Sequence, residues 1–449
     1  MDTSEEVAKK FTIRQAAFIG VGAMVGAGIF SLLGAAGEVA GAAVWLSFLI
    51  AGAIAMLQGY SFAKFGARFP SAAGLLEYVR RGFGDGHATG IIAWLILATN
   101  AIITGMVAVS FGSYASSALS TEGRLSVKFF AVLLILMMTL LNIMGSQVVA
   151  KVQSLIVFVV LAMLSVFAVA TIANMDPHLL AFSGYPSVRL IVSSVALTFF
   201  AFLGFGVITF TAKDLANPKR QLPRAMFLAL GIATVIYVAV ALGVFGTLTV
   251  DKVIASGGTA LAVAAEPVLG RAGYWMMTVT ALFSTSGATN AGLYPAAGLC
   301  EQMTAQEQFP PVLGRRFGGR APAGLLITAA AAIVLAAGFD LSAIASLGSA
   351  IALVVFTLVT AAHFRVYRET GASPFVLGVA IVSTVAVLAT FVFTTLIHDR
   401  GSMIAMAVIL ALSIGLDVVW KRVRAARAPG PTIVLPASDG EELPSRQTR

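Results

Sequence analysis

Two glycine-rich segments interrupt apolar stretches of the chain that carry no charge. They are residues 20–30, with the sequence GVGAMVGAGIF, and residues 199–206, with the sequence FFAFLGFG. Glycine destabilises a helix interior and lets a ligand approach the main chain closely. A helix that breaks in apolar surroundings exposes amides with partial positive charge at one end and carbonyls with partial negative charge at the other. Both segments are therefore candidate binding residues for a small molecule that carries both charges.

The stretches around these segments are those of a membrane protein. Of the 449 residues, 59% are hydrophobic and 11% are charged, and the mean hydropathy is +0.94. Long uncharged apolar runs are typical of membrane-spanning helices. Bounded by ionisable residues, twelve such runs occur, the last of them short: 15–37, 39–63, 88–121, 129–150, 152–175, 190–212, 225–250, 272–300, 321–339, 341–362, 370–397 and 401–416.

Basic residues indicate how these spans are oriented. When the loops are assigned to alternate sides, 23 of the 29 Lys and Arg residues fall on the side of the N-terminus and 6 on the other. Cytoplasmic loops are enriched in Lys and Arg, so we expect a multi-pass protein of the cell membrane with both termini in the cytoplasm. The net charge of +9 is then explained by attraction of the cytoplasmic basic residues to anionic lipid rather than by binding of nucleic acid. Acidic residues among the first ten argue against a cleavable signal peptide.

Side chains that could perform catalysis or hold a metal are scarce. Cys300 is the only cysteine, and the four histidines, His87, His178, His363 and His398, lie at span ends or in loops. A membrane-embedded hydrolase needs a supported nucleophile, paired carboxylates or a metal set within the bilayer. The spans do not provide these groups, so the sequence predicts no enzyme and no resident cofactor, with coupling to Na⁺ or H⁺ left open.

The interrupted spans are the first and the sixth, which indicates a repeat of five spans. An odd number makes the second unit enter the membrane from the opposite side. We therefore predict an all-α integral membrane fold of twelve transmembrane helices, a 5+5 inverted repeat with discontinuous spans 1 and 6, plus two extra C-terminal helices. The expected segments are a cytoplasmic N-terminus (1–12), the first repeat (13–175), the second repeat (188–362), spans 11 and 12 (370–421) and a disordered cytoplasmic tail (422–449).

Three motifs, in this order, resemble those of permeases of the amino acid-polyamine-organocation (APC) superfamily, which have the LeuT-type fold. They are residues 22–30 in span 1, residues 200–205 in span 6 and residues 217–225, NPKRQLPRA, just beyond span 6. A glycine-rich helix alone is more often a packing face, and the order and spacing of all three motifs make the resemblance specific. The resemblance implies a secondary-active transporter of amino acids that works by alternating access.

The resemblance also implies a substrate site. Its expected residues are Met24, Gly26, Ala27, Gly28, Asn100, Thr104, Phe200, Ala201, Phe202 and Leu203. The amides of residues 26–28 begin the outer half of span 1 and suit a carboxylate. The carbonyls of Met24 and of residues 200, 201 and 203 suit an ammonium group. Phe200 and Phe202 are candidate aromatic gates, and each fits simple core packing equally well.

Selectivity and coupling follow from the remaining polar residues. Spans 3 and 8 offer Asn100, Thr104, Ser284, Thr285, Ser286 and Asn290. No charged residue lies at mid-depth, so a neutral amino acid is favoured. Some proton-coupled relatives carry a lysine in span 5 where this chain has Val160. Three options remain open: a sodium ion held at Gly22, Ser284 and Ser286, transport without an ion, or a proton route that the sequence does not reveal.

Alternatives and connecting segments complete the expectations. An exchanger or exporter of amines or polyamines is disfavoured by the absence of mid-depth carboxylates, and a non-transporting amino-acid sensor by the absence of a long soluble output domain. The expected partners are a small amino acid substrate and the lipid bilayer.

Two connecting segments also carry structural expectations. Residues 67–86 predict an inner loop with a short surface helix, and residues 251–270 fit either an outer lid or a simple connector.

Overall fold

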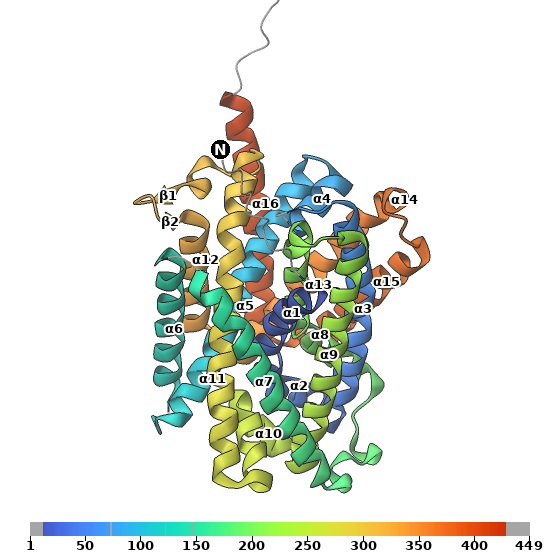
Figure 1. Cartoon of the computed structure of the whole chain (residues 1–449), viewed down its shortest axis with the longest axis vertical. Helices are drawn as coiled ribbons and strands as arrows, with labels where there is room; N and C mark the ends of the chain where they lie inside the picture. The colour runs from blue at the N-terminus through green and yellow to red at the C-terminus, as the bar shows by residue number, and fades with distance from the viewer. Residues whose placement is uncertain (1–11, 72–73, 122, 145–146, 428–449) are drawn as a thin grey trace, which may run out of the picture.

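The computed structural model describes residues 12–71, 74–121, 123–144 and 147–427 of the chain. Within these residues, ten helical segments are long and apolar enough to cross a membrane, and two shorter apolar helices cover Ile13–Gly26 and Ala323–Gly338. The helices pack side by side along one direction (Figure 1), as expected of a multi-pass membrane protein. The predicted N-terminal segment up to residue 11 and the predicted tail from residue 428 lie outside the described residues.

The first half of the chain contains an interrupted span followed by long helices. Its elements are α1 (Ile13–Ala27), α2 (Ile29–Ala40), η1 (Gly41–Ala43), α3 (Val44–Arg68), α4 (Leu75–Phe83), α5 (His87–Ala118), α6 (Arg124–Met144) and α7 (Gln147–Ala173). A capping box between Thr12 and Gln15 begins α1. Gly41, with a φ of 53°, ends α2 in a conformation that favours glycine and turns the chain toward α3.

The second half repeats this order, with an interrupted span first. Its helices are η2 (Pro177–Leu180), η3 (Phe182–Gly184), α8 (Val188–Phe200), η4 (Leu203–Asp214), α9 (Pro218–Thr247), α10 (Val250–Ser256), η5 (Gly257–Thr259), α11 (Ala260–Ala305), η6 (Pro311–Gly314), α12 (Ala323–Gly338), α13 (Leu341–Arg365), α14 (Tyr367–Thr370), α15 (Pro374–Thr394), η7 (Leu396–His398) and α16 (Arg400–Arg427). A short antiparallel hairpin with two residues in each strand, β1 (Arg316–Phe317) and β2 (Ala321–Pro322), precedes α12.

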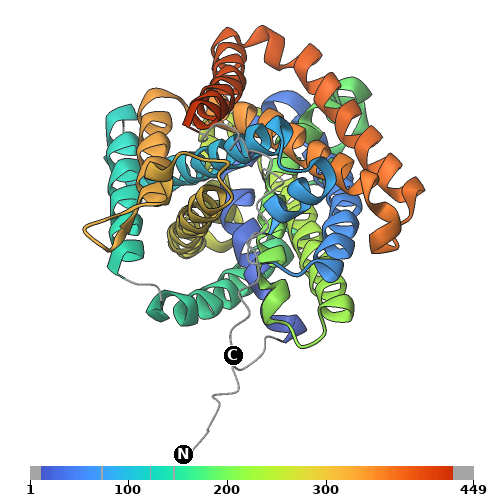
Figure 2. The same cartoon turned by 90° about the horizontal axis from the view of Figure 1, so that it is seen from above.

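The interrupted spans lie inside the bundle and the last helices lie at its edge. Residues 188–212 comprise α8 and most of η4, and 83% of their most apolar 18-residue stretch is buried. The corresponding value for α16 is 17%. In the view along the bundle, α15 and α16 (orange to red) lie at the periphery (Figure 2). A helix that is hydrophobic all round and buried belongs to the core, whereas an exposed apolar helix in a membrane protein faces lipid.

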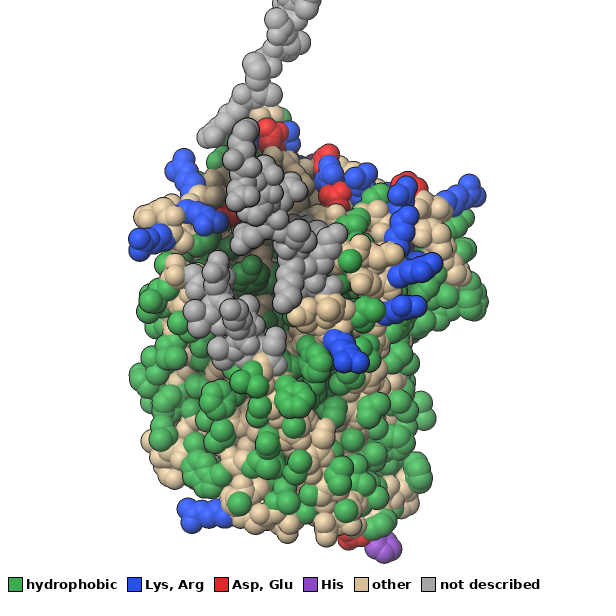
Figure 3. All heavy atoms as spheres, in the orientation of Figure 1, with side chains coloured by type: hydrophobic (Ala, Val, Ile, Leu, Met, Phe, Trp, Pro, Cys, Tyr) green, Lys and Arg blue, Asp and Glu red, His purple; other side chains and the backbone are tan. Residues whose placement is uncertain are grey.

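Charged side chains gather at one end of the molecule. Lys and Arg side chains crowd the end where α4 and α14 lie, and hydrophobic side chains cover most of the remaining visible surface (Figure 3). Ion pairs hold part of this end together, among them Arg316 with Glu301 at 2.8 Å. The same end carries the loops that the sequence assigns to the cytoplasm.

The expected surface helix in residues 67–86 is docked rather than lying free. It is α4, whose Leu76, Tyr78 and Val79 are buried. The Tyr78 ring stacks on the Phe65 ring of α3 with centroids 4.5 Å apart. Burial raises the pKa of Tyr78, so its hydroxyl keeps its proton. Glu77 accepts hydrogen bonds from the guanidinium groups of both arginines of α4, one of them 2.8 Å long. The charged groups thus offset one another while the aromatic face packs inward.

Two other segments differ in extent from the expectation. Helix α16 continues to Arg427, so residues 422–427 are helical rather than part of a tail; its last turns are rich in alanine and arginine, which are good helix formers. The outer stretch 251–270 forms α10, η5 and the first turns of α11. A methyl group placed on Gly34 of α2 would lie 2.9 Å from the Gly257 Cα, so this stretch packs directly on α2. Gly270, with a φ of 66°, then bends α11 into its long span.

Candidate functional site

The break in the first span is a single residue, Gly28. Its N–H donates to the Met24 carbonyl at 3.3 Å and ends α1, while its carbonyl accepts from the N–H groups of Ser31 and Leu32 and begins α2. The amides of Ile29 and Phe30 precede the first hydrogen-bonded turn of α2, where main-chain N–H groups have no partner within their own helix.

The amides without a partner in their own helix therefore lie further along the chain than the sequence suggests. Residues 26 and 27 lie within α1, and the Gly28 amide is bonded to Met24. The reason is that Gly28 adopts a right-handed helical conformation, with φ of −91° and ψ of −60°, so the hydrogen bonds of α1 extend one residue past its end. The Met24 carbonyl, expected to bind an ammonium group, accepts this amide in the conformation described.

The break in the sixth span is a change of helix type. Helix α8 ends at Phe200, and the N–H groups of Ala201 and Phe202 donate to carbonyls three residues back, at 3.1 and 3.0 Å. The chain then continues as the tighter helix η4, and a stretch of this type inside a span often marks a hinge. The Ala201 carbonyl accepts a hydrogen bond of 3.1 Å from the hydroxyl of Tyr237 in α9.

Tyr237 was not anticipated from the sequence. It is fully buried, and its ring packs between Phe48 of α3 and Phe202 at centroid distances of 5.4 and 5.0 Å. Its hydroxyl brings a polar side-chain group to the second break through the hydrogen bond to the Ala201 carbonyl. The sequence signal that could have identified it is a single tyrosine in an apolar span, because a tyrosine hydroxyl inside the bilayer needs a hydrogen-bond partner.

The two breaks lie directly against each other. A methyl group placed on Gly28 would overlap the Cα and Cβ atoms of Ala201, and one placed on Gly204 would overlap the main chain of Ala23 and Met24. Each break thus needs its own glycine to approach the other. Met24, Gly28, Ala201 and Leu203 are buried and Gly204 is partly buried, so the expected main-chain groups meet in the interior.

The two candidate gate residues face different neighbours. The Phe200 ring lies against Gly348 of α13 and Ile102 of α5. The Phe202 ring packs edge-on against Tyr237 of α9. Phe200 therefore borders the side of the break where α5 passes, whereas Phe202 belongs to the packing between α3 and α9.

Most of the expected polar residues of α5 and α11 bond elsewhere in this conformation. The Thr104 hydroxyl donates to the Asn100 carbonyl at 2.7 Å. The Asn290 side chain accepts from Asn142 of α6 at 2.6 Å, which ties α11 to α6. Thr285 and Ser286 donate to carbonyls of their own helix, as hydroxyls in membrane spans commonly do.

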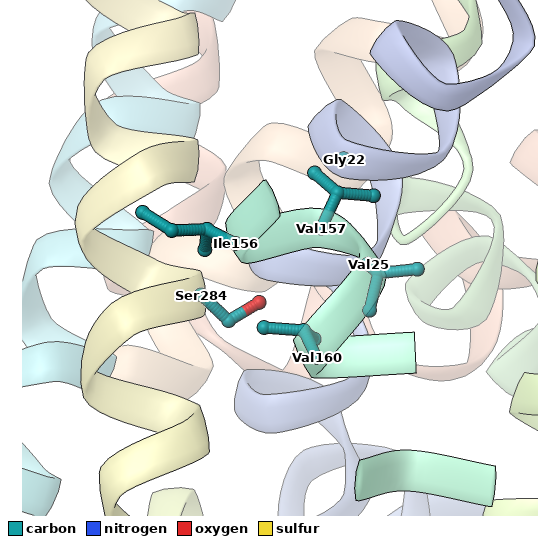
Figure 4. Close-up of a pocket in the computed structure, with 6 residues that line it drawn as sticks. All are labelled: Gly22, Val25, Ile156, Val157, Val160 and Ser284. Carbon is teal, nitrogen blue, oxygen red and sulfur yellow. The ribbon is translucent and has the colours of Figure 1, made fainter. Parts of the chain in front are cut away.

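The candidate ion site is a small and largely apolar cavity between α1, α7 and α11. It is lined by Gly22, Val25, Ile156, Val157, Val160 and Ser284. The Ser284 hydroxyl is the one polar side-chain group drawn there, among three valines and an isoleucine (Figure 4). Hard cations bind through several oxygen ligands, so these side chains do not fit a sodium ion. Ser286, the other expected ligand, is not among the lining residues and donates to the Leu282 carbonyl at 2.7 Å.

Comparison with known proteins gives consistent matches along the chain. A family model described as amino acid permease matches residues 11–415. The inner membrane transport protein YbaT of Escherichia coli is 30% identical over 407 residues, covering 90% of this chain and 94% of that protein. The branched-chain amino acid permease BcaP of Bacillus subtilis is 25% identical over 243 residues, covering 49% of this chain and 51% of that protein.

A solved structure shows the same architecture. A variant of the manganese transporter of Eremococcus coleocola aligns with a TM-score of 0.59, covering 95% of this chain and 96% of that chain at 14% sequence identity. A likeness at this level of identity concerns the fold alone. It confirms the LeuT-type fold expected from the sequence, with two interrupted helices at the centre of an apolar bundle.

Proposed function

Because the chain belongs to the amino acid permease family of the APC superfamily and is a membrane transporter of amino acids, we propose that it moves neutral amino acids by alternating access. The contact between the two breaks carries this proposal. The amides of Ile29 and Phe30 would bind the substrate carboxylate, and carbonyls of the second break would bind its ammonium group. Transport requires the two breaks to separate enough for a ligand to lie between them.

The distribution of charge supports a neutral side chain. Among the described residues, the buried side chains that can carry charge are Glu77, His363 and Asp417, on α4, in the last turn of α13 and near the end of α16. None lies on α1, α2 or α8. A charged substrate side chain buried beside these breaks would therefore lack a partner of opposite charge, which is costly inside a bilayer. The same absence disfavours amines and polyamines.

The packing on both sides of the breaks supports alternating access. On the outer side, α10 and η5 rest on α2, where a methyl group on Gly37 would lie 3.8 Å from Ile254 of α10 and 3.1 Å from the Phe245 ring of α9. On the inner side, α4 lies next to η4: a methyl group on Gly206 would lie 3.5 Å from the Leu75 side chain. We propose that these two contacts open in turn, in a cell membrane protein with both termini in the cytoplasm.

The direct experiment is uptake of a panel of labelled amino acids into proteoliposomes under sodium, proton or no imposed gradient. We expect neutral amino acids to enter, and exchange against internal amino acid to proceed when sodium is replaced by choline, because Ser284 is the one residue with a hydroxyl among the described residues that line the candidate ion site. Uptake of cationic amines in preference to neutral amino acids would contradict the proposed substrate class. Binding without transport would indicate a sensor, and strict sodium dependence would show that main-chain oxygens complete an ion site.

A further inference from the structure

The position of the Phe200 ring depends on Gly348 in another helix, α13. Phe200 is the last residue of α8, beside the second break, and 1% of it is exposed. A methyl group placed on Gly348 of α13 would overlap the Phe200 ring edge at Cε2 and would lie 3.1 Å from its Cζ. The same methyl group would lie 2.7 Å from the Ile102 side chain of α5. The ring thus fits into a notch in α13 that any larger residue would fill.

The backbone at position 348 does not itself require glycine. Gly348 lies in the interior of α13, and its φ is not in the left-handed region. Glycine is a poor helix former, and a helix interior of this kind normally favours alanine. Other helical glycines, such as Gly298 of α11 and Gly378 of α15, have no neighbour within 4 Å of an added methyl group. The space for the Phe200 ring is what distinguishes Gly348 from them.

The position of this ring bears on the space beside the break. Phe200 directly precedes Ala201, whose Cα and Cβ lie against Gly28, so the main chain that carries the ring lies at the contact between the breaks. Ile102 closes the notch from α5, between the expected site residues Asn100 and Thr104. With a ligand between the breaks, as in the proposed function, a ring that stays against Gly348 would leave space for the ligand side chain, and a displaced ring would reduce that space.

We propose that Gly348 is a specificity-determining residue that sets the largest amino acid side chain accepted, by fixing how far the Phe200 ring retracts from the break. The proposal rests on the proposed function and deepens it. Close-packed interiors yield little when a methyl group is added, so the displaced atoms are those of the side chain with the greatest freedom to move. For Gly348→Ala this is the Phe200 ring, which rotates toward the break.

The test is the size selectivity of transport in proteoliposomes. In Gly348→Ala we expect uptake of glycine and alanine to stay within about threefold of the unmodified protein and uptake of leucine and phenylalanine to fall about tenfold or more, in line with the discrimination that one methylene gives in a packed pocket. Adding Phe200→Leu to this variant should restore the larger substrates. Adding Ile102→Leu, which removes the Cγ2 branch that the methyl group would otherwise meet, should not.

Two controls separate this role from a structural one. Gly298→Ala adds the same methyl group to a membrane helix in open space and should leave selectivity unchanged. Phe200→Leu alone should raise the ratio of large to small substrates, which tests the ring even where Gly348→Ala fails to fold. An unchanged ratio in both Gly348→Ala and Phe200→Leu, in a protein that transports amino acids, would overturn the inference. Absence of amino acid uptake by the unmodified protein would instead overturn the proposed function.

Discussion

Gly28→Val is expected to abolish amino acid uptake while the protein still inserts into the membrane. The valine side chain would overlap the Cα and Cβ atoms of Ala201 and would fill the space between the two breaks that the substrate needs. Overpacking of a close-packed interior costs about 1–3 kcal/mol, which corresponds to a roughly 5- to 150-fold loss of affinity if it falls on the binding-competent state. Because the displaced groups are the proposed ligands themselves, we expect the loss at or beyond the upper end. Proteoliposome uptake and equilibrium binding measure it.

The matched control for this variant is Gly231→Val in α9. Gly231 has no neighbour within 4 Å of an added methyl group, so a branched side chain there faces open space. Both variants should be produced in similar amounts and elute as single species in detergent. Normal affinity in Gly28→Val would contradict the proposed binding of substrate at the contact between the breaks.

A second large effect is expected from neighbouring glycines of η4. Gly204→Ala should reduce uptake by roughly 100-fold, because its methyl group would overlap main-chain atoms of Ala23 and Met24, which have no freedom to rotate away. Gly206→Ala, two residues further along, would place its methyl group 3.5 Å from the Leu75 side chain, an ordinary contact, and should retain most activity.

This pair separates local geometry from general intolerance of side chains in η4. Both substitutions add one methyl group to the same short helix and change its intrinsic stability in the same direction. Equal loss in the two variants, with equal thermal stability, would show that contact between the breaks is not what limits transport. Retained uptake in Gly204→Ala would contradict the claim that transport depends on the close fit between α1 and η4 at the breaks.

The sequence predicts the class of fold because the pattern of uncharged runs is a strong constraint in a membrane. It also places the breaks, since both glycine-rich segments coincide with helix interruptions, at Gly28 and just after Phe200. Val160 lies at the crossing of α1, α7 and α11, as expected from its position in span 5. These features depend on local composition, which can be read from one chain.

Features that depend on tertiary packing could not be predicted in this way. Nothing in the sequence distinguishes Phe200, seated against α13, from Phe202, packed on α9, because both are phenylalanines at one break. The pairing of Asn290 with Asn142 depends on how α11 and α6 rotate against each other. The shift of the available amides to Ile29 and Phe30 depends on the conformation of a single glycine. Such details require coordinates.

The central claim is that main-chain groups at the two breaks bind both charged ends of the substrate. Competition binding with analogues of the best neutral substrate tests it most directly, using the amino acid itself, its amide without a carboxylate, and its deaminated acid. Hydrogen bonds to charged groups contribute about 1.5–3 kcal/mol each, so each analogue should bind roughly 10- to 100-fold more weakly than the zwitterion. An amide or a deaminated acid that competes as well as the amino acid would contradict the claim.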